Sequence, residues 1–272
     1  MEATSAGGGI VTKQKSKNGG ADHASPCAGD VILTRSEGKV APANLAFQKK
    51  TTSMNACYTH VAICIGPYVI VDATPGDGVK MRNILDDDEW KKLNEMMRDN
   101  RFRVWRSKKI WESDENTEKL RQSLHLIIEK GYNYFFGASH PANENARTLN
   151  SESLFCSQLV YLLLCEFDVL SKKLPQSSSV YPVHFENLSE DAPDGNWKNI
   201  TEGWRNHIEY LNRKRAEYDF WRESARLYIL NMGFAALTEK LRRRSRESRG
   251  QGEGPRTLNE LIEQLDKDNE NK

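Results

Sequence analysis

Residues 153–165, SLFCSQLVYLLLC, join a thiol to a run of apolar residues long enough to form a buried helix. Cys156 stands where that helix would begin. A cysteine at a helix N-terminus faces unpaired backbone N–H groups and the positive end of the helix dipole, and both lower the thiol pKa from a reference value of about 8.5. Cys156 is therefore a candidate nucleophile, although free cysteine is also among the residue types most often buried.

A predicted β-hairpin carries a base and an acid. The strand-like segments YTHVAICIG and YVIVDAT contain His60 and Asp72, and a tight turn at residues 66–68 is expected to join them. With that three-residue loop Ala62 faces Asp72, so His60 and Asp72 lie diagonally on one face of the hairpin. A two-residue loop would instead pair Val61 with Asp72 and would send His60 to the opposite face.

Cys156, His60 and Asp72 are the residue types that nucleophilic catalysis by a thiol requires. The imidazole must lie within hydrogen-bond reach of the thiol, and a third group must fix its tautomer and orientation. Considered singly, His60 would be a hydrogen-bonded residue at a strand edge and Asp72 a strand-end or turn residue. The sequence leaves both interpretations open, and the catalytic one depends on the hairpin register.

The five cysteines are an odd number at irregular spacings without a C-x-x-C pair, which favours neither a disulfide framework nor a zinc site. Cys165 lies about half a turn around the helix from Cys156, so we expect it in the core together with Cys64. Cys57 is a second, weaker candidate nucleophile because it lacks a helix terminus. No cofactor and no metal are expected, since the histidines also lack metal-ligand spacing and no nucleotide-binding or serine-hydrolase motif occurs.

The composition, 38% hydrophobic with a formal net charge of +1, predicts a globular protein without overall attraction to nucleic acid or anionic membrane. The N-terminal residues lack the apolar core of a secretory signal, and no apolar run of about 18 residues occurs. We therefore expect synthesis in the cytoplasm and no transmembrane segment.

Four regions follow from the changes of composition along the chain. The early strands followed by helices and a buried helix indicate an α+β fold, with an antiparallel sheet packed on helices, and not repeated βαβ units. The predicted divisions are a flexible arm at 1–26, a catalytic domain at 27–200, a helical extension at 201–245, and a linker with a short terminal helix at 246–272.

Residues 205–249 hold 12 Arg and Lys against 6 Asp and Glu, which could attract an acidic protein partner. Aromatic residues in this extension look suited to packing, so nucleic-acid binding is not favoured. We expect a helix that breaks near Gly233 and packs an apolar face on the domain or on a partner. That face comprises Ile208, Leu211, Trp221, Leu227 and Leu230.

Five short motifs occur in an order that resembles the circularly permuted NlpC-type papain-like proteins, in particular their YiiX/YaeF-like branch. They are GDVILTR, YTHVAICIG with VIVDAT, GYNYFFG, LFCSQLVY and VYPVHFENLS, and they span roughly residues 28 to 190. The resemblance implies Cys156 as nucleophile, His60 as base and Asp72 as the orienting acid. The family more often has Glu at the position of Asp72 and Glu at the position of Gln158.

The resemblance implies a cysteine amidase or peptidase that acts through a thioester, with a peptidoglycan peptide as the first substrate to consider. Without a signal peptide, such an enzyme would be a toxin-like effector exported by a specialised secretion system. An acyltransferase, thioesterase or deamidase acting on a lipid or a host protein is the alternative, and a non-catalytic binding module is a further one.

Overall fold

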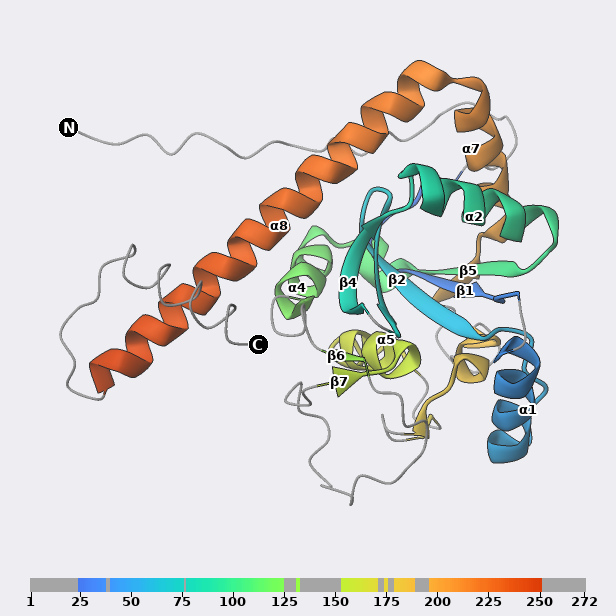
Figure 1. The fold of residues 1–272 in the computed structure, drawn as a ribbon, viewed down its shortest axis with the longest axis horizontal. Coiled ribbons are helices and arrows are strands. Elements are labelled where there is room, and N and C mark those ends of the chain that lie inside the picture. Colours follow the sequence, from blue (N-terminus) through green and yellow to red (C-terminus); the bar gives the residue numbers. More distant parts are fainter. Residues whose placement is uncertain are drawn as a thin grey trace.

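A computed structural model of the chain describes residues 24–37, 40–75, 77–124, 131–132, 153–170, 174–175, 179–188 and 196–250. Its fold is α+β, as the sequence predicts, with helices packed around an antiparallel sheet (Figure 1). The predicted terminal helix after residue 256 and the motif GYNYFFG lie largely outside the described residues.

The sheet has six strands in the order β4-β3-β2-β1-β5-β8, and every neighbouring pair is antiparallel. The strands predicted around GDVILT, YTHVAICIG, YVIVDAT and FRVWR all form, whereas β4 and β8 were not predicted. The strands are β1 (Asp30–Thr34), β2 (His60–Gly66), β3 (Val69–Thr74), β4 (Gly78–Asn83), β5 (Phe102–Ser107) and β8 (Trp197–Asn199).

Helices flank this sheet, and a short parallel pair of strands, β6 (Gly131–Tyr132) and β7 (Ser153–Leu154), precedes the Cys156 helix. A helix begins at Asp87, where three acidic residues occupy the first turn. The helices are α1 (Val40–Thr52), α2 (Asp87–Arg98), α3 (Lys108–Trp111), α4 (Asp114–Leu124), α5 (Cys156–Cys165), the 3₁₀ helix η2 (Pro182–Phe185), α7 (Thr201–Arg213) and α8 (Arg215–Gly250).

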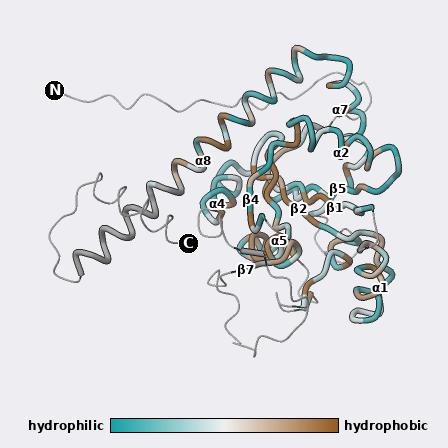
Figure 2. Tube along the Cα trace, in the orientation of Figure 1, coloured by the Kyte–Doolittle hydropathy of each residue, from teal (hydrophilic) through white to brown (hydrophobic). Residues whose placement is uncertain are grey.

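Helix α5 supplies a large part of the hydrophobic core. Leu159, Leu163 and Leu164 are fully buried, and the helix packs against β2 and β3. Figure 2 shows hydrophobic residues concentrated in α5 and the sheet. A helix that is apolar nearly all round can only be stable when it is covered on most sides. This packing fixes the N-terminus of α5 near the start of β2.

The β2–β3 hairpin has the register that puts His60 and Asp72 on one face. Its strands meet across the two-residue turn Pro67–Tyr68, and not across the three-residue loop expected. A bulge between Cys64 and Gly66 then adds one residue to β2, which restores the expected alternation beyond it. The pairs are Ile63 with Val71, Cys64 with Ile70 and Gly66 with Val69.

A buried ion pair ties β1 to β5. The fully buried carboxylate of Asp30 accepts hydrogen bonds from Nε and Nη2 of Arg106 at 2.7 and 2.8 Å, and from the indole of Trp204 at 3.1 Å. Gly29, just before it, has φ +88°, and a Cβ there would lie 2.8 Å from Ile110. The motif Gly-Asp therefore stabilises the core, because Gly29 leaves room for Ile110 and Asp30 neutralises the buried charge of Arg106.

Residues 24–26, which were predicted to lie in the flexible arm at 1–26, contact the domain, whereas residues 1–23 lie outside the described residues. The backbone N–H of Ala24 donates to the carbonyl of Gly203, and the carbonyl of Ser25 accepts from Arg106. Pro26 is buried. Residues 24–26 therefore belong to the domain, because their backbone polar groups find partners on α7 and β5.

The extension is helical, but its details differ from those predicted. The break lies at Lys214, between α7 and α8, and α8 continues through Gly233. Ile208 and Leu211 are buried, whereas Leu227 and Leu230 are 54% and 68% exposed. In this register of α8 both leucines are largely exposed, with Leu230 beside a pocket that α8 forms with β4. Among the described residues, no helix is both long and apolar enough to span a bilayer.

Candidate active site

The structure brings the three predicted residues together. Nε2 of His60, the first residue of β2, lies 3.2 Å from Oδ2 of Asp72 in β3. The Cys156 thiol, at the first residue of α5, lies near enough to the same imidazole for its charge to raise the pKa of His60. His60 therefore lies between a thiol and a carboxylate, the arrangement that a Cys-His-Asp triad requires.

The charges of this cluster favour an imidazolium. Burial alone would lower the pKa of His60, but the negative charge of Cys156, the hydrogen bonds to Asp72 and Cys156, and the charge of Asp72 together raise that pKa to about 10. Burial likewise would raise the pKa of Asp72, whereas His60 and Arg82 hold it below its usual range. An imidazolium at neutral pH stabilises a neighbouring thiolate.

The first turn of α5 supplies hydrogen-bond donors beside the thiol. Phe155 occupies the N-cap position and its side chain has no acceptor for the N–H groups of the first turn. Ser157 donates to the carbonyl of Val180 at 2.7 Å, which fixes this helix end against the segment before η2. The N–H groups of the turn are therefore suited to stabilise an oxyanion on an acyl group bound at Cys156.

Arg82 on β4 holds the other side of Asp72, a contact that no sequence pattern predicted. Its Nε donates to Oδ1 of Asp72 at 2.9 Å, and its Nη2 donates to Thr74 at 2.7 Å and to Asp77 at 2.8 Å. Both carboxylate oxygens of Asp72 are thus fixed, one by His60 and one by Arg82. Only the β3–β4 register, which was not predicted, could have shown this contact.

A buried clamp positions the residues before His60. Oε1 of Glu186 accepts from the backbone N–H groups of Cys57 and Tyr58 at 2.7 and 3.1 Å. Gln48 of α1 donates to the carbonyl of Tyr58 at 2.9 Å and accepts from the N–H of Val183 at 2.9 Å. The motif VYPVHFENLS therefore supports the entry to β2, a role that the sequence did not reveal.

The remaining cysteines are poor nucleophile candidates. Burial raises the pKa of Cys27 and Cys64, with Asp30 adding to it. Cys57 is exposed, but partial desolvation and the charge of Glu186 raise its pKa. Cys165 was expected in the core and is exposed, because it lies in the last turn of α5 on the side away from Cys156. None of the five cysteines, all of which lie in the described part of the chain, forms a disulfide.

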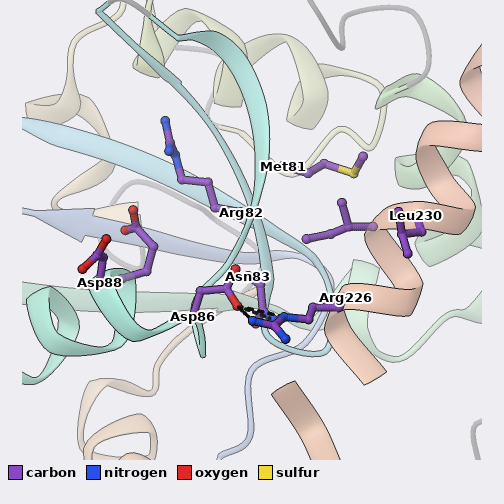
Figure 3. Close-up of a pocket in the computed structure, with 9 residues that line it drawn as sticks. Met81, Arg82, Asn83, Asp86, Asp88, Arg226 and Leu230 are labelled. Atoms are coloured by element: carbon purple, nitrogen blue, oxygen red, sulfur yellow. Dashed lines mark hydrogen bonds and ion pairs between the residues drawn. The ribbon is translucent and has the colours of Figure 1, made fainter. Parts of the chain in front are cut away.

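A pocket of about 570 Å³ lies between β4, the start of α2 and α8 (Figure 3). Arg82 lines it, and the ion pair between Asp86 and Arg226 crosses one side. Cys156 and His60 do not line this pocket, so it is separate from the space where an acyl group would meet the thiol.

The described part of the chain contains no cluster of three His, Cys, Asp or Glu side chains arranged to bind a metal ion. His184 accepts from the backbone N–H of Tyr181, and His207 lies 2.5 Å from the hydroxyl of Tyr68. Both imidazoles therefore have local structural partners. His125 and His140 lie outside the described residues.

Comparison of the chain with protein-family models, curated proteins and solved structures gives no significant match. The functional assignment therefore rests on the geometry around Cys156 and on the chemistry of its neighbours.

Proposed function

We propose that the chain is a cysteine hydrolase with Cys156 as nucleophile, His60 as general base and acid, and Asp72 as the group that orients the imidazole. The observation that carries the proposal is the position of His60, whose imidazole lies 3.2 Å from the Asp72 carboxylate and beside the Cys156 thiol. A structural histidine at a strand end would need only one such partner.

In the proposed reaction, the Cys156 thiolate attacks an acyl carbon and forms a carbon–sulfur bond. N–H groups of the first turn of α5 stabilise the resulting oxyanion. The imidazolium of His60 gives its proton to the leaving amine as the carbon–nitrogen bond breaks. His60 then takes a proton from water, which attacks the thioester and releases the acid.

An amide or peptide bond is the scissile bond that we favour, and the circularly permuted papain-like fold is part of the same proposal. Both rest on the resemblance to NlpC-type proteins, as do peptidoglycan as substrate and a role as an exported effector. Transfer of the acyl group to another acceptor, or thioester cleavage or deamidation, would use the same first step.

The first test is the pH dependence of alkylation at Cys156. At pH 5.5 iodoacetamide is expected to modify Cys156 at least about tenfold faster than Cys57 or Cys165, although both of these are exposed, because the charged imidazole of His60 lies beside the Cys156 thiol and stabilises an anion there. Mass spectrometry of the modified peptides gives each rate.

His60→Ala should remove the advantage of Cys156 at pH 5.5 and leave the rates of the other two cysteines unchanged. Equal rates for all three cysteines in the unmodified chain would contradict the proposal and would favour a non-catalytic binding module.

The titration of His60 supplies a second prediction. An anion next to an imidazole favours its protonated form, so the imidazole of His60 should stay charged until about pH 10. Cys156→Ala removes that anion and leaves burial to act, which should lower the titration midpoint. Side-chain NMR of labelled histidine measures both midpoints, with His184 as an internal control. An unchanged midpoint in the variant would show that no thiolate faces His60.

Arg82 should act as a positioning residue. Arg82→Ala frees one oxygen of Asp72, and a charge-assisted hydrogen bond contributes about 1.5–3 kcal/mol. Since about 1.4 kcal/mol corresponds to a factor of ten in rate, we expect the alkylation rate of Cys156 at pH 5.5 to fall at least about tenfold. Arg82→Lys should recover part of that rate. Lys80→Ala is the matched control on the same strand, because Lys80 contacts Asp77. The same rate in Arg82→Ala as in Lys80→Ala would argue against this role.

A further inference from the structure

The outward face of α8 carries a heptad pattern that the domain does not cover. Apolar residues alternate at spacings of three and four along 22 residues of one helix face, with one acidic residue among them. This set, which we name the α8 seam, consists of Phe220, Glu223, Leu227, Leu230, Phe234, Leu237 and Leu241. Spacing of this kind is the signature of a helix that pairs with another helix.

The large apolar residues of the seam whose side chains the structure describes are open to solvent in the single chain. Phe220 is 63% exposed, Leu227 54%, Leu230 68% and Phe234 74%. They are four of the six exposed large hydrophobic residues in the described part of the chain. Apolar residues gathered on one face mark an interaction surface more often than scattered ones do.

The other face of α8 is occupied by the domain. Ala225 is buried, and the hydroxyl of Tyr228 donates to the carbonyl of Ile65 at 2.8 Å. Gly66 makes room for that ring, because a Cβ there would lie 2.8 Å from it. Arg222 binds Asp87 of α2 at 3.0 Å. The domain therefore contacts α8 on the side opposite the seam.

The chain's own C-terminal segment does not match this surface. The seam spans about 32 Å at 1.5 Å per residue, whereas the apolar residues Leu258, Leu261 and Leu265 span only about 10 Å. If the chain turned back at residues 251–256, the C-terminal segment would lie beside Arg244 and Ser248. These residues occupy heptad positions of α8, and both are polar. A partner helix of the same length as the seam fits better.

We propose that α8 pairs antiparallel with α8 of a second copy of this chain, seam against seam. In the register that places Leu227 against Leu230 of the second copy, Phe220 meets Leu237 and Glu223 meets Phe234. An antiparallel two-fold pair repeats each contact, so one surface serves both copies. Glu223 is a single polar residue in the seam, a feature that selects register in paired helices.

The charges beside the seam favour this antiparallel register. Asp219 and Lys240 occupy equivalent heptad positions next to the seam. In the proposed pair, Asp219 of each copy lies opposite Lys240 of the other, which gives two attractive contacts. The other facing pairs at the flanks, Arg226 with Gly233 and Ser224 with Asn231, carry no like charges. In a parallel pair Asp219 and Lys240 would each face serine.

The test is the mass of the full chain in solution over a concentration series, measured by sedimentation equilibrium. We expect a dimer, and we expect Leu227→Glu with Leu230→Glu to raise its dissociation constant at least about 100-fold, since each copy loses two apolar contacts. Circular dichroism should be unchanged, because both leucines are exposed in the monomer. Leu261→Glu with Leu265→Glu is the matched control and should leave the dimer intact.

Charge exchange tests the orientation. Asp219→Lys alone and Lys240→Asp alone should each weaken the dimer, and the two together should restore it. A chain that stays monomeric throughout the series, a dimer that survives the leucine variant, or charge changes that do not compensate would each overturn the proposal. If the chain dimerised only after the Leu261 and Leu265 changes, the C-terminal segment would be what covers the seam. If the monomer bound anionic lipid vesicles through Leu227 and Leu230, the seam would be a membrane-binding surface.

Discussion

A Cys156→Ala variant is expected to lose the esterase activity of the chain by at least about 10⁴-fold, because the reaction loses its nucleophile and not merely an accessory contact. The substrate for this measurement is p-nitrophenyl acetate, which acylates reactive thiolates whatever the natural substrate is. The wild-type chain should release up to one equivalent of nitrophenolate in a burst as the thioester forms. Alanine should be tolerated at the start of α5, because it is small and has the highest helix propensity.

Cys165→Ala is the matched control for this prediction. Cys165 ends the same helix, and its thiol is exposed to the reagent, but it has no place beside His60. The burst should persist in that variant at its wild-type amplitude. A burst that persists in Cys156→Ala and vanishes in Cys165→Ala or Cys57→Ala would mean that another thiol is the nucleophile and that the proposed triad is wrong.

Local sequence signals were sufficient to predict the hairpin and the Cys156 helix. The alternation of apolar residues around His60 and Asp72, and the apolar run after Cys156, are properties of short segments. A three-residue loop was the reason for predicting His60 and Asp72 on one face of the hairpin. In the structure, a two-residue turn and a bulge produce the same alignment. The predicted face was correct although the predicted turn was not, because the turn is one residue shorter than expected and the bulge adds one residue to β2.

Contacts between distant segments were not predictable in the same way. Arg82 reaches Asp72 from a strand whose residues GVKMRN give little sign of a buried position. Glu186 binds the N–H of Cys57, 129 residues earlier in the chain. Such contacts depend on strand order and on helix packing, which hydrophobic periodicity does not specify.

In the helical extension, composition alone did not predict which apolar residues pack on the domain. Ile208 and Trp221 pack on the domain as predicted, but Leu227 and Leu230 are exposed on another face of α8. Within α8, Leu230 follows Trp221 by nine residues, which places it about half a turn away at 100° per residue. A helix that packs Trp221 on the domain therefore has Leu230 on its other side.

Asp30→Ala is expected to lower the free energy of unfolding by about 3–5 kcal/mol, because it leaves the charge of Arg106 buried without its partner. The carboxylate also accepts from the indole of Trp204 and the N–H of Cys27, so several donors lose their acceptor at once. Urea denaturation measures the change. Asp99→Ala is the matched control: Asp99 pairs with Arg101 at 2.7 Å but is half exposed, and such pairs contribute about 0–1 kcal/mol.

The double variant Asp30→Ala with Arg106→Met separates the cost of an unpaired charge from the loss of packing. If the unpaired guanidinium is the main cause, removing it should recover a substantial part of the stability that Asp30→Ala loses, since buried ion pairs replaced by apolar residues often cost little. If the double variant is less stable than Asp30→Ala, the pair contributes mainly through the packing of Arg106 against Trp111. A loss below about 1 kcal/mol in Asp30→Ala itself would contradict the prediction and would mean that water reaches Arg106.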